Sequence, residues 1–177
     1  DTAADGLVYH LRAPYQYRAA EDDMTEAEFL GVLELDVIET IERIGADNIA
    51  CFFAEPIMGA GGVLVPPSGY HKRMREITAQ HDIMYVADEV VTAWGRLREM
   101  FASEAAYGMI PDIICTAKGI TSGYQPLSAT IVSDEIYDVI SGPDGMFLHG
   151  MTYSGHPAAC AAGLANIDIL ENEKIPE

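Results

Sequence analysis

The stretch PDIICTAKGITSGYQPL, residues 111–127, places a lysine directly after an apolar run. Ile113, Ile114 and Cys115 are typical of a buried strand, and Lys118 follows where that strand should end. An ordinary surface lysine needs no such setting, because lysine is mostly found in contact with water. The position of Lys118 therefore raises the question of a chemical role.

The segments around this stretch predict alternating strands and helices. Buried strands are expected at residues 49–54, 83–87, 113–117 and 127–133. Helices are expected after a capping box of Thr25 and Glu28 with a stop at Gly45, from a Ser68 cap to about residue 81, weakly at 101–107, and at 157–170. Continuously apolar strands separated by helices predict an α/β fold with three layers, α/β/α, and a mostly parallel sheet.

Ionisable residues follow three of these strands. Glu55 comes after the first, Asp88 and Glu89 after the second, and Lys118 after the third. Parallel strands bring their carboxyl ends to one edge, where such sheets bind ligands. Each residue alone is more simply a turn, cap or surface residue. Together they favour a site for an anionic or carbonyl ligand, and both interpretations stay open on this evidence.

The composition narrows the classes of partner. A formal charge of −18 argues against nucleic acid and anionic membranes. The apolar runs are far shorter than the roughly 20 residues of a membrane helix. Cys51, Cys115 and Cys160 are widely spaced in apolar surroundings, so no metal site is predicted. Scattered, buried free thiols favour a reducing compartment, and we expect the cytoplasm.

Four motifs carry a resemblance to a known family. YVADEVVTAWGR and TAKGITSGYQPL are flanked by FFAEPIMGAGGVLVPPSGY upstream and HGMTYSGHPAACAAGLANI downstream. In this order they resemble the class III (omega-type) aminotransferases, which are pyridoxal-phosphate enzymes of fold type I. The resemblance implies that residues 1–177 form part of the large, cofactor-binding domain.

The resemblance also implies roles for individual residues. Lys118 matches the Schiff-base lysine, which must be a neutral amine tuned by desolvation. Asp88 matches the carboxylate that pairs with the pyridine nitrogen and keeps it protonated. Val90 should lie on the same side of an extended chain as Asp88 and pack on the cofactor ring. Glu55 has a positional and electrostatic role near the ring, and Thr152 contacts the phosphate bound to the neighbouring subunit.

These matches imply a homodimer with a shared active site. The expected reaction is transamination between an amine or omega-amino acid and a keto acid such as pyruvate. A pyridoxal-phosphate mutase or decarboxylase on the same scaffold is the alternative enzyme. An inactive fragment with a role only in assembly is the alternative of another class.

The chain also departs from the family pattern. Val91 stands where many members carry glutamine, and Arg98 stands where a glycine is usual. The resemblance implies that a complete member has an N-terminal segment with a phosphate-binding loop and a C-terminal small domain. We expect neither within residues 1–177, and we expect this stretch to be inactive by itself.

Overall fold

A four-stranded mixed sheet forms the centre of the computed structural model, which describes residues 6–21 and 23–176. The strands are β1 (Cys51–Ala54), β2 (Met84–Asp88), β3 (Ile113–Thr116) and β4 (Ala129–Val132), in that spatial order. β1, β2 and β3 are parallel, while β4 is antiparallel to β3. The connection from β3 to β4 holds only a short 3₁₀ helix, and a parallel return requires a longer crossover. The predicted α/β class with a mostly parallel sheet is confirmed.

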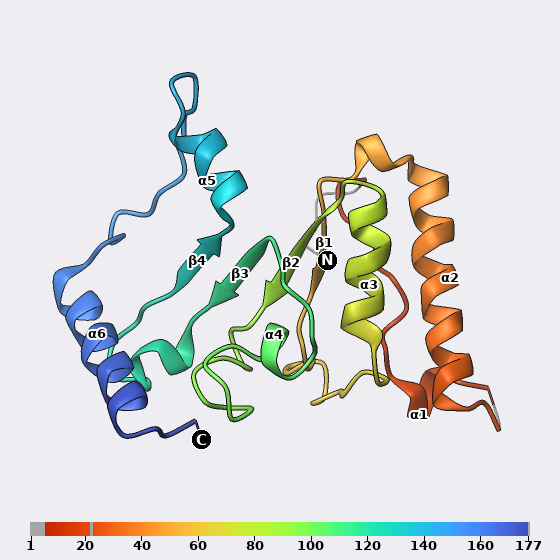
Figure 1. Cartoon of the computed structure of the whole chain (residues 1–177), viewed down its shortest axis with the longest axis horizontal. Coiled ribbons are helices and arrows are strands. Elements are labelled where there is room, and N and C mark those ends of the chain that lie inside the picture. The colour runs from red at the N-terminus through yellow and green to blue at the C-terminus, as the bar shows by residue number, and fades with distance from the viewer. Residues whose placement is uncertain (1–5, 22, 177) are drawn as a thin grey trace.

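In Figure 1, α2 and α3 lie on the side of the sheet where β1 is the edge strand, and α6 lies on the side where β4 is the edge strand. The helices are α1 (Gln16–Ala19), α2 (Glu26–Ile44), α3 (Tyr70–Gln80), α4 (Ala102–Ala105), α5 (Asp134–Ser141) and α6 (Pro157–Asn172), with 3₁₀ helices η1 (Ala46–Asn48) and η2 (Lys118–Thr121). None of the helices in the described residues is both long and apolar enough to cross a membrane.

The predicted start and stop of α2 are confirmed. The Thr25 hydroxyl accepts the Glu28 N–H at 3.3 Å, and the Glu28 carboxylate accepts the Thr25 N–H at 2.8 Å. Gly45 ends the helix with a φ of 85°, which suits a residue without a side chain. This reciprocal capping box satisfies two N–H groups that the first turn of a helix leaves unpaired.

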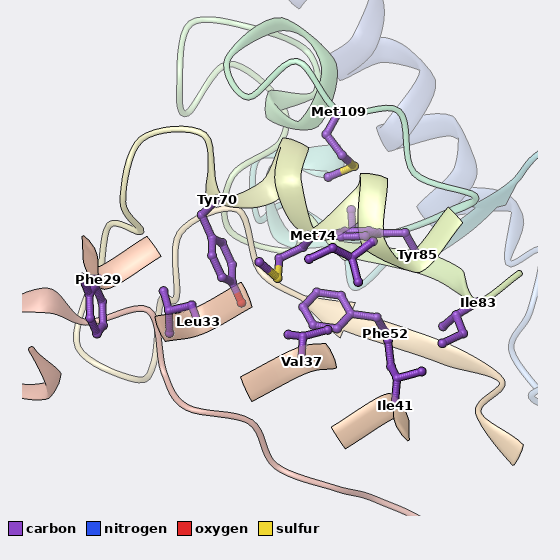
Figure 2. Packing of buried hydrophobic residues seen from close by; sticks show 12 residues of the cluster. Phe29, Leu33, Val37, Ile41, Phe52, Tyr70, Met74, Ile83, Tyr85 and Met109 are labelled. Carbon is purple, nitrogen blue, oxygen red and sulfur yellow. The ribbon is translucent and has the colours of Figure 1, made fainter. Parts of the chain in front are cut away.

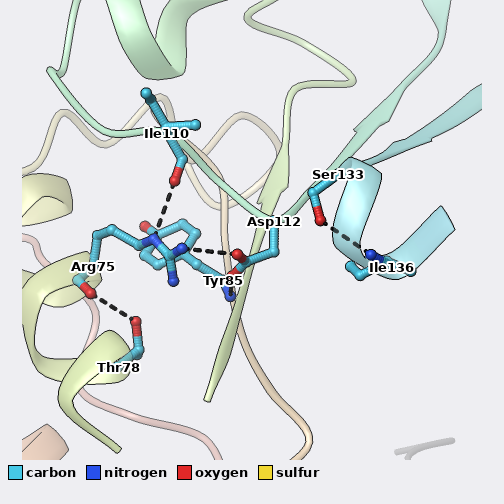
Figure 3. Close-up of polar contacts among 7 residues, drawn as sticks. All are labelled: Arg75, Thr78, Tyr85, Ile110, Asp112, Ser133 and Ile136. Carbon is cyan, nitrogen blue, oxygen red and sulfur yellow. Dashed lines mark hydrogen bonds and ion pairs between the residues drawn. The ribbon is translucent and has the colours of Figure 1, made fainter. Parts of the chain in front are cut away.

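Two other helix starts differ from the prediction. Ser68 does not cap α3; its N–H donates to the Glu26 carboxylate, and Gly69 precedes the helix in a left-handed conformation. α5 was not predicted, although Ser133 caps it by accepting the Ile136 N–H at 3.5 Å (Figure 3). The apolar residues between 136 and 140 follow helical spacing after this cap, so the sequence held a signal for α5 that the prediction missed.

The hydrophobic core lies between the sheet and the pair α2 and α3. Figure 2 shows Phe52 of β1 among Val37 of α2, Met74 of α3 and Tyr85 of β2. The Phe52 and Tyr85 rings lie 5.1 Å apart between centroids. The cluster comprises Phe29, Leu33, Val37, Ile41, Phe52, Tyr70, Met74, Ile77, Ile83, Tyr85, Ala87 and Met109.

The opposite face of the sheet is more open in the described residues. Phe53 of β1 is 58% exposed and Met84 of β2 is 37% exposed, while their neighbours Phe52 and Tyr85 are buried. Strand residues alternate between faces, so this contrast separates a face covered by α2 and α3 from one that these helices do not reach.

Polar contacts fix β2 to the helical layer. Figure 3 shows Arg75 of α3 donating to the Ile110 carbonyl at 3.1 Å and to the Asp112 carboxylate at 2.7 Å. The second carboxylate oxygen of Asp112 accepts the Tyr85 N–H at 2.6 Å. Asp112 therefore supplies the hydrogen bond that the start of β2 would otherwise lack, and it ties β2 to α3 and to the chain entering β3.

A buried histidine makes a second such link. The His71 side chain of α3 is 2% exposed and lies 2.9 Å from the Pro56 carbonyl and 2.8 Å from the Tyr85 hydroxyl. Because a carbonyl only accepts, Nε2 carries the proton and Nδ1 accepts from Tyr85. Burial lowers the pKa of His71 to about 4, so the ring stays neutral near pH 7.

We predict that two arginines on α3 differ in their contribution to stability. Arg75→Ala should lower the free energy of unfolding by about 2 kcal/mol, because it removes charge-assisted bonds to half-buried groups. Arg73→Ala removes ion pairs with Glu34 and Glu76 in which the arginine is more exposed than Arg75, and it should cost less than about 1 kcal/mol. Urea unfolding of the purified protein measures both, and equal losses would contradict the assigned role of Asp112.

We also predict that His71 makes stability depend on pH. The unfolded ring has the ordinary pKa of 6.5 and the folded ring a pKa of about 4, so the unfolded state binds the proton first as the pH falls. Unfolding should therefore become easier between about pH 6.5 and pH 4, by up to roughly 3 kcal/mol. His71→Gln removes this titration; if its urea midpoints fell with pH as steeply as those of the wild type, the assignment to His71 would be wrong.

Candidate active site

The parallel strands deliver three candidate residues to one edge of the sheet. Glu55 directly follows β1, Asp88 ends β2, and Lys118 begins η2 just after β3. The register pairs Asp88 with Cys115, three residues before Lys118. The carboxyl ends of β1, β2 and β3 therefore meet at the same edge, as predicted from the order of the strands.

Asp88 is held by a tight turn at the end of β2. One carboxylate oxygen accepts the Val90 N–H at 3.0 Å, an Asx-turn contact between residues two apart. The extended chain expected from Asp88 to Val90 is therefore wrong, because β2 ends at Asp88 and Val90, half-buried, lies in the turn. Among the described residues the other oxygen makes no hydrogen bond and is available to a ligand.

The surroundings of Asp88 include a thiol on the same sheet face. Burial raises the pKa of Cys115, and the nearby Asp88 carboxylate raises it further. All three cysteines are free, but Cys51 is exposed and Cys115 and Cys160 are half-buried. The prediction that all three thiols are buried is therefore wrong.

Glu89 has a different role from Asp88. Its side chain is completely buried, and its carboxylate accepts the N–H groups of Ala102 at 2.9 Å and Ser103 at 2.7 Å. The hydroxyls of Thr92 and Ser103 also donate to it. These bonds cap the start of α4, so Glu89 anchors a loop and only Asp88 faces the site.

Lys118 carries an unusual backbone conformation. Its φ is 45°, in the left-handed region that residues with a side chain rarely adopt, and Ser122 at the other end of η2 has a φ of 49°. The side chain is exposed, and among the described residues it makes no hydrogen bond or ion pair. The expected desolvation of this amine is therefore not provided by the described residues.

Trp94 explains the glycine that follows the lysine. A Cβ at Gly119 would lie 2.8 Å from the Trp94 Cβ, closer than such atoms approach in proteins. The indole N–H donates to the Thr116 hydroxyl at 2.7 Å. Gly119 thus allows Trp94 to pack against η2, and the left-handed residue of the turn is Lys118 itself. Sequence reasoning missed Trp94, although it is the only tryptophan of the chain.

Glu55 is turned toward its own loop. Its carboxylate accepts the Gly59 N–H at 2.7 Å. A Cβ at Gly59 would lie 3.0 Å from a methyl group of Val91, so the loop after β1 packs against the turn after β2. Val91, the first departure from the family pattern, therefore lies at the contact between the two loops.

The second departure has a backbone counterpart. Arg98 has a φ of 67°, a conformation in which glycine is favoured because it has no Cβ. The residue adopts the turn that a glycine would make there at lower cost.

Thr152 lies apart from the other candidates. It is exposed in the loop between α5 and α6, and no contact joins it to Glu55, Asp88, Val90 or Lys118 in the described residues. The structure therefore brings four of the five predicted site residues to one edge of the sheet and leaves Thr152 elsewhere.

Two hollows line the described surface. One of about 800 Å³ runs along β1 and includes Glu55 and Asp88 in its wall. The other, about 670 Å³, lies between residues 97–100 and the end of α6 and touches none of the predicted site residues. Only the first of these two adjoins predicted site residues, and Lys118 lines neither of them.

The available groups fit pyridoxal phosphate. An exposed amine, Lys118, and a carboxylate oxygen without a hydrogen bond, on Asp88, end neighbouring strands at one edge. An amine suits the aldehyde of this cofactor and a carboxylate suits its pyridine nitrogen. Among the described residues no group of three or more histidine, cysteine, aspartate or glutamate side chains is arranged to hold a metal ion.

Comparisons with known proteins agree with this reading. The family model for class-III aminotransferases matches residues 4–177. A putrescine–pyruvate aminotransferase of Pseudomonas aeruginosa is 48% identical over 178 residues, covering 100% of this chain and 38% of that protein. A mitochondrial gamma-aminobutyrate transaminase of Oryza sativa is 43% identical over 174 residues, covering 97% of this chain and 34% of its own length.

Solved structures show the same fold. An (S)-enantioselective omega-transaminase from Thermomicrobium roseum matches with a TM-score of 0.89 and 48% identity, over 94% of this chain and 37% of that one. A pyridoxal-phosphate-bound amine transaminase from an uncultivated Pseudomonas species gives 0.88 and 46%, over 94% and 38%. The chain thus spans little more than a third of the length of these relatives, and it belongs to the class-III aminotransferase family.

Proposed function

We propose that this chain supplies the lysine and the aspartate of a pyridoxal-phosphate site in a transaminase. The expected reaction moves an amino group between an amine or omega-amino acid and a keto acid such as pyruvate. The observation that carries the proposal is the placement of Lys118 and Asp88 at the ends of neighbouring parallel strands, within a family match that covers residues 4–177.

Each residue has a task that its chemistry supports. When bound, pyridoxal phosphate supplies an aldehyde that exchanges amino groups and a ring that accepts electron density. The Lys118 amine would hold the cofactor at its aldehyde carbon and, when free of it, would carry a proton to and from the substrate. Asp88 holds a proton at the pyridine nitrogen, with one oxygen fixed by the Val90 N–H. Val90 packs beside the ring, and Glu55 fixes the loop to Gly59.

A homodimer with a shared site is part of this proposal. Thr152 is exposed, and its loop also exposes Phe147, Leu148, Met151 and Tyr153 by 66–88%. Large apolar side chains exposed together favour burial against another protein surface. We infer a twofold dimer in which the partner's Thr152 contacts the cofactor phosphate.

The remaining features concern substrates and surroundings. A charge of −18 supports small-molecule substrates over nucleic acid or anionic membranes as partners. Three free cysteines support a reducing compartment, and we propose the cytoplasm.

A mutase or decarboxylase would use the same Lys118 and Asp88. Incubation with an amine and pyruvate separates these reactions, because alanine forms only by transamination.

We predict that borohydride reduction traps the cofactor on Lys118. In a full-length aminotransferase that contains this chain, peptide mapping after reduction should find the pyridoxyl group on this lysine. Lys118→Ala should abolish both the adduct and transamination, because no other described amine ends a strand at this edge. Lys72→Ala, at an exposed position of α3, is the matched control and should keep both. An adduct on another lysine would refute the assignment.

We predict that Asp88→Asn lowers the rate of transamination roughly a hundredfold or more, the scale of losing one preorganised electrostatic contact. The amide keeps the shape and the bond to Val90 but removes the charge that holds a proton at the pyridine nitrogen. Asp134→Asn, at an exposed site in the first turn of α5, is the control and should leave the rate unchanged. Steady-state kinetics with a saturating amine donor measures both, and a wild-type rate in Asp88→Asn would exclude this role.

A further inference from the structure

We propose that Asn166 of α6 is a positioning residue for Lys118. The proposal rests on the proposed function, in which the Lys118 amine holds the cofactor. Asn166 lies far along the chain from the lysine. Its contacts fix the short helix η2 that Lys118 begins.

Three hydrogen bonds join Asn166 to η2 and its end. The side-chain amide nitrogen donates to the carbonyls of Gly119 at 2.9 Å and Ile120 at 3.2 Å. The amide oxygen accepts the Ser122 hydroxyl at 2.6 Å. The orientation of the amide is determined by these partners, because the two carbonyls can only accept and require the NH₂ group.

The packing of α6 allows this approach. Gly163 lies one turn before Asn166 on the same face of α6. A Cβ at Gly163 would lie 2.9 Å from the Leu127 side chain and 3.7 Å from the Ile120 carbonyl. The glycine therefore brings the helix close enough for a short amide side chain to reach two carbonyls of η2.

The hydrogen bonds from Asn166 hold η2 in an uncommon backbone conformation. Lys118 and Ser122 both have left-handed backbones, which residues with a Cβ adopt only when surrounding contacts hold them there. Trp94 packs against Gly119, and Asn166 binds the Gly119 carbonyl, so η2 is held by both elements. The exposed Lys118 side chain makes no hydrogen bond or ion pair in the described residues, so the backbone of η2 sets where it begins.

A purely structural role predicts something different. If Asn166 only fixed α6 to η2, its loss would lower the free energy of unfolding, as the loss of any similar hydrogen bonds would. If it positions Lys118, its loss should change how fast the amine captures the cofactor aldehyde, beyond any change in stability. The rate of a reaction between two positioned groups falls steeply when one of them is misplaced, by up to a hundredfold for a displacement of about 1 Å.

The test uses a full-length aminotransferase that contains this chain, freed of cofactor. Asn166→Ala removes all three bonds, whereas Asn166→Asp keeps the shape and the acceptor for Ser122 but cannot donate to the carbonyls. Thr25→Ala, which removes the α2 cap, is the control for a general loss of stability. Pyridoxal phosphate is added below saturation, and borohydride traps the Lys118 adduct at successive times.

We expect trapping at Lys118 to slow roughly tenfold or more in both Asn166 variants and to keep its wild-type rate in Thr25→Ala. A second readout needs no cofactor. Amide hydrogen exchange in a peptide covering residues 118–124 should become faster in the Asn166 variants and stay unchanged in Thr25→Ala, because only the former release η2.

The outcomes separate the two proposals. If the wild type forms no adduct at Lys118, the proposed function fails. If it forms one and the Asn166 variants form it equally fast, or Thr25→Ala slows it as much, the positioning role is overturned. Should the Asn166 variants not fold, Asn166→Gln decides: this variant keeps the amide but shifts its donor and its acceptor by one methylene group relative to η2. Slower trapping with an unchanged melting temperature supports the role, and a wild-type rate overturns it.

Discussion

The parallel register of β1, β2 and β3 is the constraint on which the rest of the site depends. It sets Asp88 opposite Cys115, and so it places the end of β2 beside the residues that lead into Lys118. A shift of one residue would turn Asp88 toward the core that Tyr85 and Ala87 fill. The register is protected by burial, because the alternation that puts Tyr85 and Phe52 into the core is the same alternation that turns Asp88 away from it.

Buried polar groups stabilise the loops around this edge without occupying it. Glu89 caps α4, His71 holds the Pro56 carbonyl, and the Thr116 hydroxyl accepts from Trp94. Among the described residues every buried side-chain nitrogen or oxygen has a hydrogen-bond partner. In contrast, one carboxylate oxygen of Asp88 and the amine of Lys118 make no hydrogen bond among the described residues. Groups that are left unpaired within a satisfied network are the groups that remain available for a ligand.

Much of this arrangement can be predicted from the sequence, because it depends on signals that are local in the chain. Features that depend on the folded structure cannot be predicted in this way. Apolar runs, the Thr25 and Glu28 pair and the charged residues at strand ends are local signals, and each located its element or its edge. Other features depend on contacts between distant segments. Gly119 is required by Trp94, and Glu89 is required by the start of α4; neither need can be seen without the fold. The turn at Val90 was missed because the Asp88 side chain, rather than strand periodicity, sets the backbone there.

At Lys118 the placement of the amine and its removal from water depend on different parts of the structure. A catalytic lysine must be placed, and it must lose enough water to be nucleophilic. Placement is achieved within this chain, since Trp94 and Asn166 both hold the backbone of η2. The described residues do not remove water from the amine, because they leave Lys118 exposed. A surface that covers Lys118 would therefore remove water from the amine without disturbing the backbone that positions it.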